Sequence, residues 1–179
     1  TVDLPDGSQI TLDANSEISY NNCNFTTNRD VDLRGHAYFV VESGSDFEVS
    51  LSSSSVHVLG TRFDALDHQG GIMVKCYEGE IEVENEGVFY NLIEKEGISI
   101  EPGSPVEEFS FQSSLPNWSE QYGKYQFTAL FEILEVLSVK YDVLIECDPN
   151  LDKTTPFTGK LPNDDLEGAL EILSGSLSL

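Results

Sequence analysis

The sequence predicts a mainly β domain, arranged as a short-strand sandwich, a barrel or a solenoid, followed by a small α+β domain. Up to about residue 100, apolar and polar residues alternate in short runs separated by turn residues, which is the pattern of half-buried strands. Residues 101–105 contain two prolines and a glycine, which a strand ladder does not tolerate. Beyond Trp118, apolar residues recur at helical spacing. We therefore expect domains at 1–103 and 125–179, with a linker or connecting strand at 104–124.

The first predicted hairpin joins strands at 2–4 and 10–12 through the turn Pro5-Asp6-Gly7. Proline presets the turn dihedral, and glycine accepts a positive φ. Further strands are predicted at 37–41, 47–51, 56–59, 72–76, 81–83 and 88–93. Strands at this spacing are typical of sandwiches, barrels and solenoids, and the alternation alone does not choose among them.

The second domain is predicted to consist of two strand–helix halves. The first helix follows Thr128 as its N-cap, and its apolar face comprises Phe127, Leu130, Phe131, Leu134, Leu137 and Tyr141. Strands are expected at 143–145 and 157–161. The second helix begins at Asp164, with Glu167 three residues later as in a capping box, and Gly175 is its expected C-cap.

The charge of the chain is strongly acidic. It has 32 Asp and Glu against 9 Lys and Arg, a formal net charge of −23. Nucleic acids and anionic membrane surfaces require basic patches, so we exclude both as partners. A basic partner or cations remain compatible with the charge. If the partner surface is basic, we expect association to slow as salt rises.

The cysteines and the hydropathy do not fix a compartment. Cys23, Cys76 and Cys147 are too few and too widely spaced for a disulfide framework or a metal motif, and we expect Cys76 to be buried. No stretch approaches the roughly 20 apolar residues that span a bilayer, and no signal peptide is present. Because the chain opens directly on a strand pattern, we expect it to be a fragment of a longer protein.

The densest acidic region runs from Glu78 to Glu108, where ten glutamates are opposed by Lys95 alone. Glu80, Glu82 and Glu84 alternate with apolar residues, so they should project from one sheet face, roughly 7 Å apart. Glycosidases use carboxylates at similar distances, but they also need unequal pKa values and a cleft. We expect a solvated face that limits edge pairing, and whether this region binds cations stays open.

Other constellations give no catalytic or metal-binding prediction. The spacing of Asp64, Asp67 and His68 does not match that of metal ligands on one helix, and we expect these residues in a loop. His36 and His57 are distant from them in sequence. The aromatic residues could form a sugar-binding platform if exposed together, but their strand positions favour the core; they are Tyr38, Phe39, Phe47, Phe63, Tyr77, Phe89 and Tyr90. Nucleophile elbows and phosphate-binding motifs are absent. We predict no enzyme, no cofactor and no metal site.

Five blocks of the first domain resemble the FecR family, the periplasmic sensor regions of transmembrane anti-sigma regulators. They are Leu4-Pro5-Asp6-Gly7-Ser8, Leu12-Asp13-Ala14-Asn15-Ser16, Leu33-Arg34-Gly35-His36-Ala37-Tyr38-Phe39-Val40-Val41, Val56-His57-Val58-Leu59-Gly60-Thr61-Arg62-Phe63-Asp64 and Tyr77-Glu78-Gly79-Glu80-Ile81-Glu82-Val83. His36 stands where the family often carries an acid.

The second domain resembles the C-terminal domain often appended to FecR sensors, which is related to the short signalling domain called STN (secretin and TonB N-terminus). The matching segments are Tyr125-Gln126-Phe127, Leu134-Glu135-Val136-Leu137, Tyr141-Asp142-Val143, Phe157-Thr158-Gly159-Lys160-Leu161 and Leu166-Glu167-Gly168-Ala169-Leu170-Glu171-Ile172-Leu173. The family's last strands should follow the second helix, so we expect this domain to be truncated at its C-terminus. Such a truncation would leave an open sheet edge.

The resemblance implies a signalling relay. It implies that the chain is the periplasmic domain of a single-pass inner-membrane protein, that the signalling domain of a TonB-dependent outer-membrane transducer docks on it, and that a cytoplasmic segment outside this chain holds an extracytoplasmic-function (ECF) sigma factor. The 157–161 strand is the expected docking edge, by strand addition; the predicted partner-binding residues are Gln126, Phe157, Thr158, Gly159, Lys160 and Leu161. The alternative is a glycan-binding or adhesive β module at the cell surface.

Overall fold

A computed structural model describes the chain except residues 117, 119–121, 149–150 and 178–179. The chain divides into two compact units, Thr1–Ser110 and Phe111–Leu179, and each is described by itself. Among the described residues, no helix is long and apolar enough to cross a membrane. A strand lies at Glu107–Ser110, inside the segment expected to be a linker or connecting strand; the domain boundaries at 103 and 125 stay a prediction.

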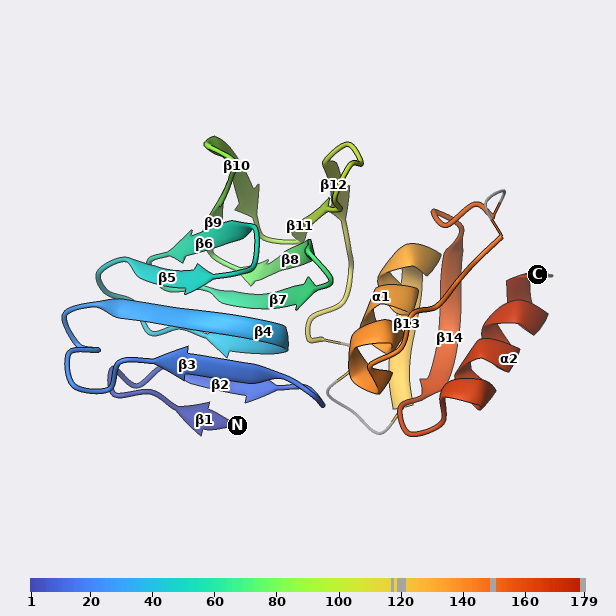
Figure 1. The fold of residues 1–179 in the computed structure, drawn as a ribbon, viewed down its shortest axis with the longest axis horizontal. Coiled ribbons are helices and arrows are strands. Elements are labelled where there is room, and N and C mark those ends of the chain that lie inside the picture. Colours follow the sequence, from blue (N-terminus) through green and yellow to red (C-terminus); the bar gives the residue numbers. More distant parts are fainter. Residues whose placement is uncertain (117, 119–121, 149–150, 178–179) are drawn as a thin grey trace. The chain divides into compact units, whose positions relative to one another are not determined.

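The first unit is a curled antiparallel sheet with one parallel strand pair, as the alternating pattern predicts for a mainly β domain (Figure 1). Its strands are β1 Val2–Asp3, β2 Gln9–Leu12, β3 Glu17–Tyr20, β4 Arg29–Val40, β5 Phe47–Ser50, β6 Ser54–Val58, β7 Arg62–His68, β8 Gly71–Glu78, β9 Glu80–Asn85, β10 Val88–Ile93, β11 Glu96–Ile100 and β12 Glu107–Ser110. The main path of the sheet runs β10-β9-β6-β5-β4-β7-β8-β11-β12.

The long strand β4 holds the two halves of this sheet together. Its first half pairs with β3 and β5, and its second half pairs with β2 and β7. The change of partners occurs at Gly35, which has φ +92°. A Cβ built there would lie 2.9 Å from the Ser16 Cα. Glycine is therefore required for both the dihedral and the space at this bend.

The core of the first unit lies between the two halves of the curled sheet. It is built from inward-facing residues of nearly every strand, including Phe39, Phe47 and Phe63, none of which is exposed. The Phe39 and Phe63 rings stack with centroids 4.6 Å apart. Cys76 lies in the same core, as predicted. Burial of this kind is the main driving force that holds such a sheet closed.

In the part of the second unit that the structure describes, two antiparallel strands form a sheet and two helices accompany it. Its elements are β13 Tyr122–Ala129, α1 Leu130–Tyr141, β14 Pro156–Pro162 and α2 Leu166–Leu177. Both helices contribute to one core with the inward residues of the strands, which comprises Tyr125, Leu130, Ile133, Leu134, Leu137, Phe157, Leu161, Ala169 and Leu173. The helical spacing predicted most of this α1 face. Phe127 was expected on it but lies in β13 instead.

The ends of the two helices differ from the sequence prediction. Helix α1 has Ala129 as its N-cap, with no side-chain cap bond, and Thr128 belongs to β13. The first N–H groups of α1 instead donate to the backbone carbonyls of Thr155 and Lys153. At the N-terminus of α2, the Asp165 Oδ1 accepts a hydrogen bond from the Gly168 N–H at 3.0 Å. The capping residue is therefore Asp165, one residue later than the predicted Asp164. Gly175 lies inside α2.

The strand predicted at 143–145 is wrong. Helix α1 ends at Tyr141, and its C-cap Asp142 has a left-handed φ of 52°, which lets the chain turn back while the Val143 N–H donates to the Ser138 carbonyl. Residues 143–148 then run without strand pairing. A strand needs a neighbour for its backbone groups, and none of the described strands pairs with this segment.

Candidate functional site

The β13–β14 ribbon has one buried face and one exposed face. The Tyr125, Phe157 and Leu161 side chains lie on the buried face, in the core of the second unit. Lys124, Gln126, Thr158 and Lys160 are exposed. Lys124 and Lys160 are register partners, directly opposite one another across the two strands. Because successive strand residues alternate between faces, this register places the two lysine side chains on the same exposed face.

A β-bulge interrupts the ribbon next to the lysine pair. Tyr125 is opposite Gly159 and Thr128 is opposite Phe157, so Gln126 and Phe127 together face Thr158. Phe127 has φ 52°, a left-handed conformation that is strained for an aromatic residue. Its N–H donates to the Thr158 Oγ1 at 2.9 Å, and Phe127 is 71% exposed.

A hollow of about 470 Å³ opens on the exposed face of the ribbon. One wall is the segment Ser113–Pro116, and the other is made of residues from both strands: Lys124, Tyr125, Gln126, Thr158, Gly159 and Lys160. Leu115 contributes an exposed apolar side chain at this wall. The hollow therefore combines two ammonium groups, an amide, a hydroxyl and an apolar rim, which suits binding rather than chemistry.

The structure brings four of the six predicted site residues into this hollow: Gln126, Thr158, Gly159 and Lys160. The side chains of Phe157 and Leu161 lie in the core, so only their backbone groups are available to a partner. Packing favours glycine at position 159, because a Cβ there would meet the Phe157 ring at 2.6 Å. The assignment of this surface to partner binding stays a prediction.

Sequence reasoning missed Lys124 and Phe127 as residues of this surface. The periodicity assigned Phe127 to the apolar face of α1, since a bulge leaves no signal in a hydrophobic pattern. Lys124 preceded the predicted strand–helix half by one residue. Only the strand register, which the sequence does not specify, shows that it lies opposite Lys160.

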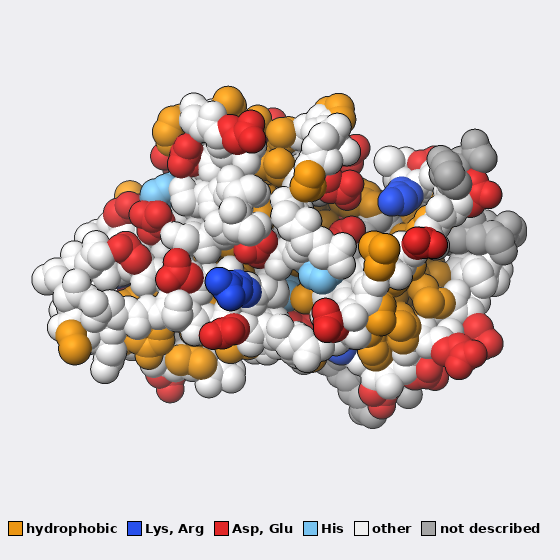
Figure 2. All heavy atoms as spheres, in the orientation of Figure 1, with side chains coloured by type: hydrophobic (Ala, Val, Ile, Leu, Met, Phe, Trp, Pro, Cys, Tyr) orange, Lys and Arg blue, Asp and Glu red, His pale blue; other side chains and the backbone are white. Residues whose placement is uncertain are grey.

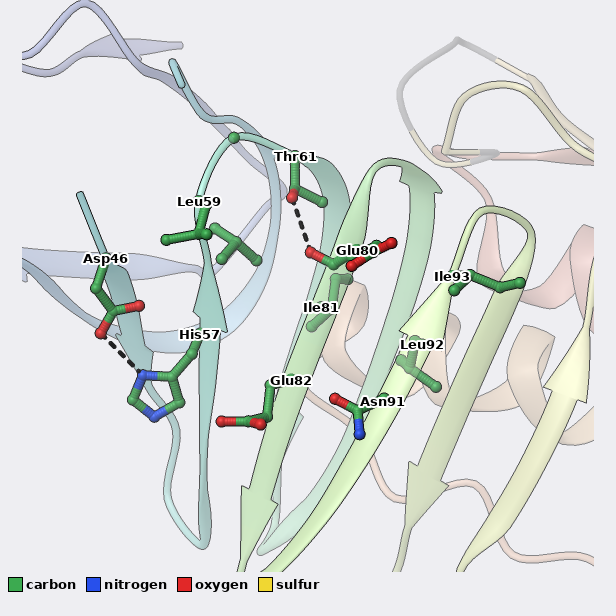
Figure 3. A pocket seen from close by; sticks show the side chains of 12 residues that line it. Asp46, His57, Leu59, Thr61, Glu80, Ile81, Glu82, Asn91, Leu92 and Ile93 are labelled. Carbon is green, nitrogen blue, oxygen red and sulfur yellow. Dashed lines mark hydrogen bonds and ion pairs between the residues drawn. The ribbon is translucent and has the colours of Figure 1, made fainter. Parts of the chain in front are cut away.

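A second hollow, of about 480 Å³, lies in the first unit beside β6, β9 and β10 (Figure 3). His57, Glu82 and Asn91 follow one another across these three strands in register, and the His57 ring points toward Asp46, with Nδ1 3.3 Å from Oδ2 (Figure 3). Leu59 and Ile93 form exposed apolar walls. No aromatic side chain is among its described lining residues, so it lacks the stacking surface of a typical sugar site.

A buried charged cluster lies elsewhere in the first unit. His36 Nε2 is 2.8 Å from Asp64 Oδ2, and His36 Nδ1 is 3.6 Å from Asp13 Oδ2. Burial alone would lower the pKa of His36, but the Asp64 and Asp13 carboxylates outweigh it and raise that pKa above its ordinary value. The cluster joins β4 to β7, which suggests a structural role.

The loop predicted for Asp64, Asp67 and His68 is wrong, because all three lie in β7. Asp67 accepts hydrogen bonds from the Ser52 backbone N–H and hydroxyl. His36 and Asp64, separated in sequence, meet through the β4–β7 register. Among the residues that the structure describes, no group of three or more His, Cys, Asp and Glu side chains could hold a metal ion.

The structure agrees with the predicted acidic face on β9 and with the predicted burial of most of the aromatic residues. Glu80 and Glu82 are exposed on β9 and alternate with buried Ile81 and Val83, as predicted. Of the aromatic residues, Phe39, Phe47, Phe63 and Tyr77 are buried, and Phe89 is exposed. Most of the expected aromatic platform is therefore core, as the strand positions favoured.

Each of the two units matches a family model. The family model described as FecR protein matches residues 1–82, and the model described as FecR, C-terminal, matches residues 124–179. No curated protein matches the chain significantly.

Two crystal structures of a candidate anti-sigma factor from Parabacteroides distasonis ATCC 8503, at 1.65 and 2.50 Å resolution, share its fold. Their TM-scores are 0.78 and 0.77, with 24% identity over 99% of this chain and 86% of the other. At that identity the likeness shows the fold. The matches of the two FecR models, one in each unit, show that the chain belongs to the FecR family.

Proposed function

We propose that this chain is the sensor part of an anti-sigma factor, the periplasmic domain of a single-pass inner-membrane protein. In this proposal it receives a signal from a TonB-dependent outer-membrane transducer and passes it, through segments outside this chain, to an ECF sigma factor. The observation that carries the proposal is the match of the FecR models in both units. The fold shared with the candidate anti-sigma factor of Parabacteroides distasonis supports it.

The signalling domain of the transducer docks on the second unit, which we propose to be STN-like. Strand β14 pairs with β13 along one edge, and none of the described strands pairs with its other edge. An open edge of this kind can accept a strand from a partner through backbone hydrogen bonds. Pro156 and Pro162 bound the strand and lack N–H donors, so they confine pairing to the five residues between them.

The test is calorimetric titration of this chain with the periplasmic signalling domain of the transducer encoded nearest to it. Saturable binding is expected, whereas the signalling domain of an unrelated transducer, used as the control, should not bind. A folded chain that fails to bind its own signalling domain at high concentration would contradict the proposal. Binding of an oligosaccharide instead would favour the glycan-binding module.

Edge pairing at β14 is best tested without a substitution. A proline at position 157 would remove a backbone donor, but Phe157 is a core residue and its replacement would unfold the unit. Amide hydrogen exchange on the bound and free chain avoids this difficulty. Protection of the backbone of residues 157–161 on binding is expected if a strand adds at this edge. Unchanged exchange there in a saturated complex would exclude strand addition at β14.

A further inference from the structure

The hollow beside β6, β9 and β10 in the first unit joins carboxylates to exposed apolar side chains. Asp46, Glu80 and Glu82 are exposed acidic residues of its lining, and Leu59 and Ile93 are 64% and 55% exposed. Single apolar side chains on a surface are ordinary, but here two of them border one hollow of about 480 Å³. A hollow of this size with apolar walls and a few polar groups is a typical form of binding site.

The strand register fixes the positions of the carboxylates in this hollow. Glu80 and Glu82 lie two residues apart on β9, and such residues project from the same face roughly 7 Å apart. Ile93 is the register partner of Glu80, and His57 is the register partner of Glu82. The Thr61 hydroxyl donates to the Glu80 carbonyl at 2.9 Å, which holds this end of β9 in place (Figure 3).

The charge of this hollow is not balanced by basic side chains of its own lining. No Lys or Arg is among the described residues that line it. The basic residues next along the chain have other partners: Arg62 Nη1 lies 3.1 Å from Glu78 Oε2, and the Lys95 ammonium group lies over the Tyr77 ring, 5.7 Å from its centroid. A cation from outside the chain would therefore be attracted to the hollow.

The arrangement of the carboxylates suits separate cationic side chains better than one metal ion. A Ca²⁺ ion needs about six to eight converging oxygens, and no group of acidic, His and Cys side chains in the described part of the chain could hold a metal ion. An arginine pairs with a single carboxylate through two hydrogen bonds, and its apolar stem can lie along side chains such as Leu59 and Ile93. Alternate side chains of an extended segment are also roughly 7 Å apart, which matches Glu80 and Glu82.

We propose that the hollow beside β6, β9 and β10 binds an extended basic segment of a partner protein. Two arginine side chains at alternate positions reach Glu80 and Glu82, and their apolar stems lie against Leu59 and Ile93. The inference goes beyond the proposed function, because it adds a contact site on the first unit to the docking edge of the second. Acidic side chains also lie over β5 and β6 in Figure 2, and with the net charge of −23 they attract a basic segment.

The first test titrates the capped peptide Ala-Arg-Ala-Arg-Ala into the isotope-labelled 179-residue chain and follows the amide signals by NMR. Signals of residues 57–61, 80–82 and 91–93, which line the hollow, should shift with saturation. The peptide Ala-Ala-Arg-Arg-Ala has the same charge at the wrong spacing and should bind roughly 3-fold more weakly. The peptide Ala-Glu-Ala-Glu-Ala should leave these signals unshifted. Equal binding of the two arginine peptides, or shifts caused by the acidic one, would overturn the proposal.

Two double variants separate this site from the charge of the whole chain. Glu80→Gln combined with Glu82→Gln should weaken binding of the alternating arginine peptide by roughly 10-fold. Glu107→Gln combined with Glu108→Gln is the matched control, because it removes the same charge from exposed positions of β12 outside the hollow, and it should weaken binding by less than about 2-fold. Equal weakening by the two double variants would mean that only the net charge attracts the peptide, and the inference would fall.

A further pair of variants tests the apolar wall of the hollow. Ile93→Thr keeps a β-branched side chain on an exposed strand position but removes apolar surface, and it should weaken binding of the peptide by roughly 3-fold. Val88→Thr is its control, because Val88 is an exposed apolar residue of the same strand, β10, outside the hollow, and it should bind like the wild type. An Ile93→Thr variant that binds as tightly as the wild type would overturn the contact with the arginine stems.

These titrations do not use the transducer, so the inference and the proposed function can fail independently. If the alternating arginine peptide shifts the hollow but the signalling domain does not bind the chain, the inference stands and the proposed function falls. If the signalling domain binds but the peptide leaves residues 57–61, 80–82 and 91–93 unshifted, the inference falls and the proposed function stands.

Discussion

At the scale of single residues, the buried His36 makes the stability of the first unit depend on pH. His36 is buried between two carboxylates, with Asp64 within hydrogen-bond distance. An isolated buried charge is costly, whereas a paired and hydrogen-bonded one is tolerated. The protonated imidazole therefore stabilises the contact of β4 with β7, and the stability of the first unit becomes dependent on pH.

The raised pKa of His36 fixes the sign of this dependence. A group whose pKa is higher in the folded than in the unfolded state stabilises the fold fully below its unfolded value, about 6.5, and loses that contribution as pH rises through the folded value. We expect the free energy of unfolding of the first unit to fall as pH rises above about 6.5. Urea denaturation at several pH values measures it.

The control for this prediction is His36→Gln, which should remove the pH-dependent part of the curve and cost about 3 kcal/mol at pH 6. His57→Gln serves as a second control, because His57 is only partly buried and lies outside this cluster. A wild-type stability that rises between pH 6.5 and 8.5, or a slope unchanged in His36→Gln, would contradict the assignment.

At the scale of elements, the strands were predictable because burial on one face repeats with a period of two residues. The alternation predicted β10 to the residue and the central part of β9. The bend in β4 at Gly35 was not predictable, because the pattern carries no information about partners. The junction of β13 with α1 was also misread. There the first turn is capped by carbonyls of the 153–155 loop, which is distant in sequence.

The same limit applies to the candidate site. The sequence analysis named Thr158 and Lys160 as part of the 157–161 edge, but it did not separate them from Phe157 and Leu161, whose side chains are buried. The opposing residue Lys124 depends on register, and the position of Phe127 depends on a bulge. Strand register is set by turn geometry and by the packed face, and neither is visible in one strand alone.

The bend of β4 gives a prediction at this scale. Gly35→Ala should lower the free energy of unfolding by about 2–4 kcal/mol, because the new Cβ meets the Ser16 backbone and the φ of +92° is strained for alanine. Gly87→Ala is the matched control, since Gly87 has φ +79° but no atom within 4 Å of the new Cβ. It should cost about 1–2 kcal/mol, the strain alone. Equal losses in urea denaturation would show that the close contact with Ser16 contributes nothing.

At the scale of the whole molecule, the two units have separate cores and distinct kinds of surface. The first unit holds most of the acidic residues, including the exposed row on β9. The second carries the opposed lysines beside a hollow. The acidic side chains of the first unit act on a partner at long range, and salt screens this interaction.

The net charge predicts the salt dependence of association with the transducer's signalling domain. If the partner surface is basic, the acidic field of the chain at −23 attracts it at long range, and salt screens this attraction as the Debye length falls from about 30 Å at 0.01 M to about 8 Å at 0.15 M. We expect the association rate in stopped-flow experiments to fall by roughly 3- to 10-fold over this range. A rate that does not change with salt would exclude charge steering, and a rate that rises would mean that the partner surface is acidic and is repelled by the chain.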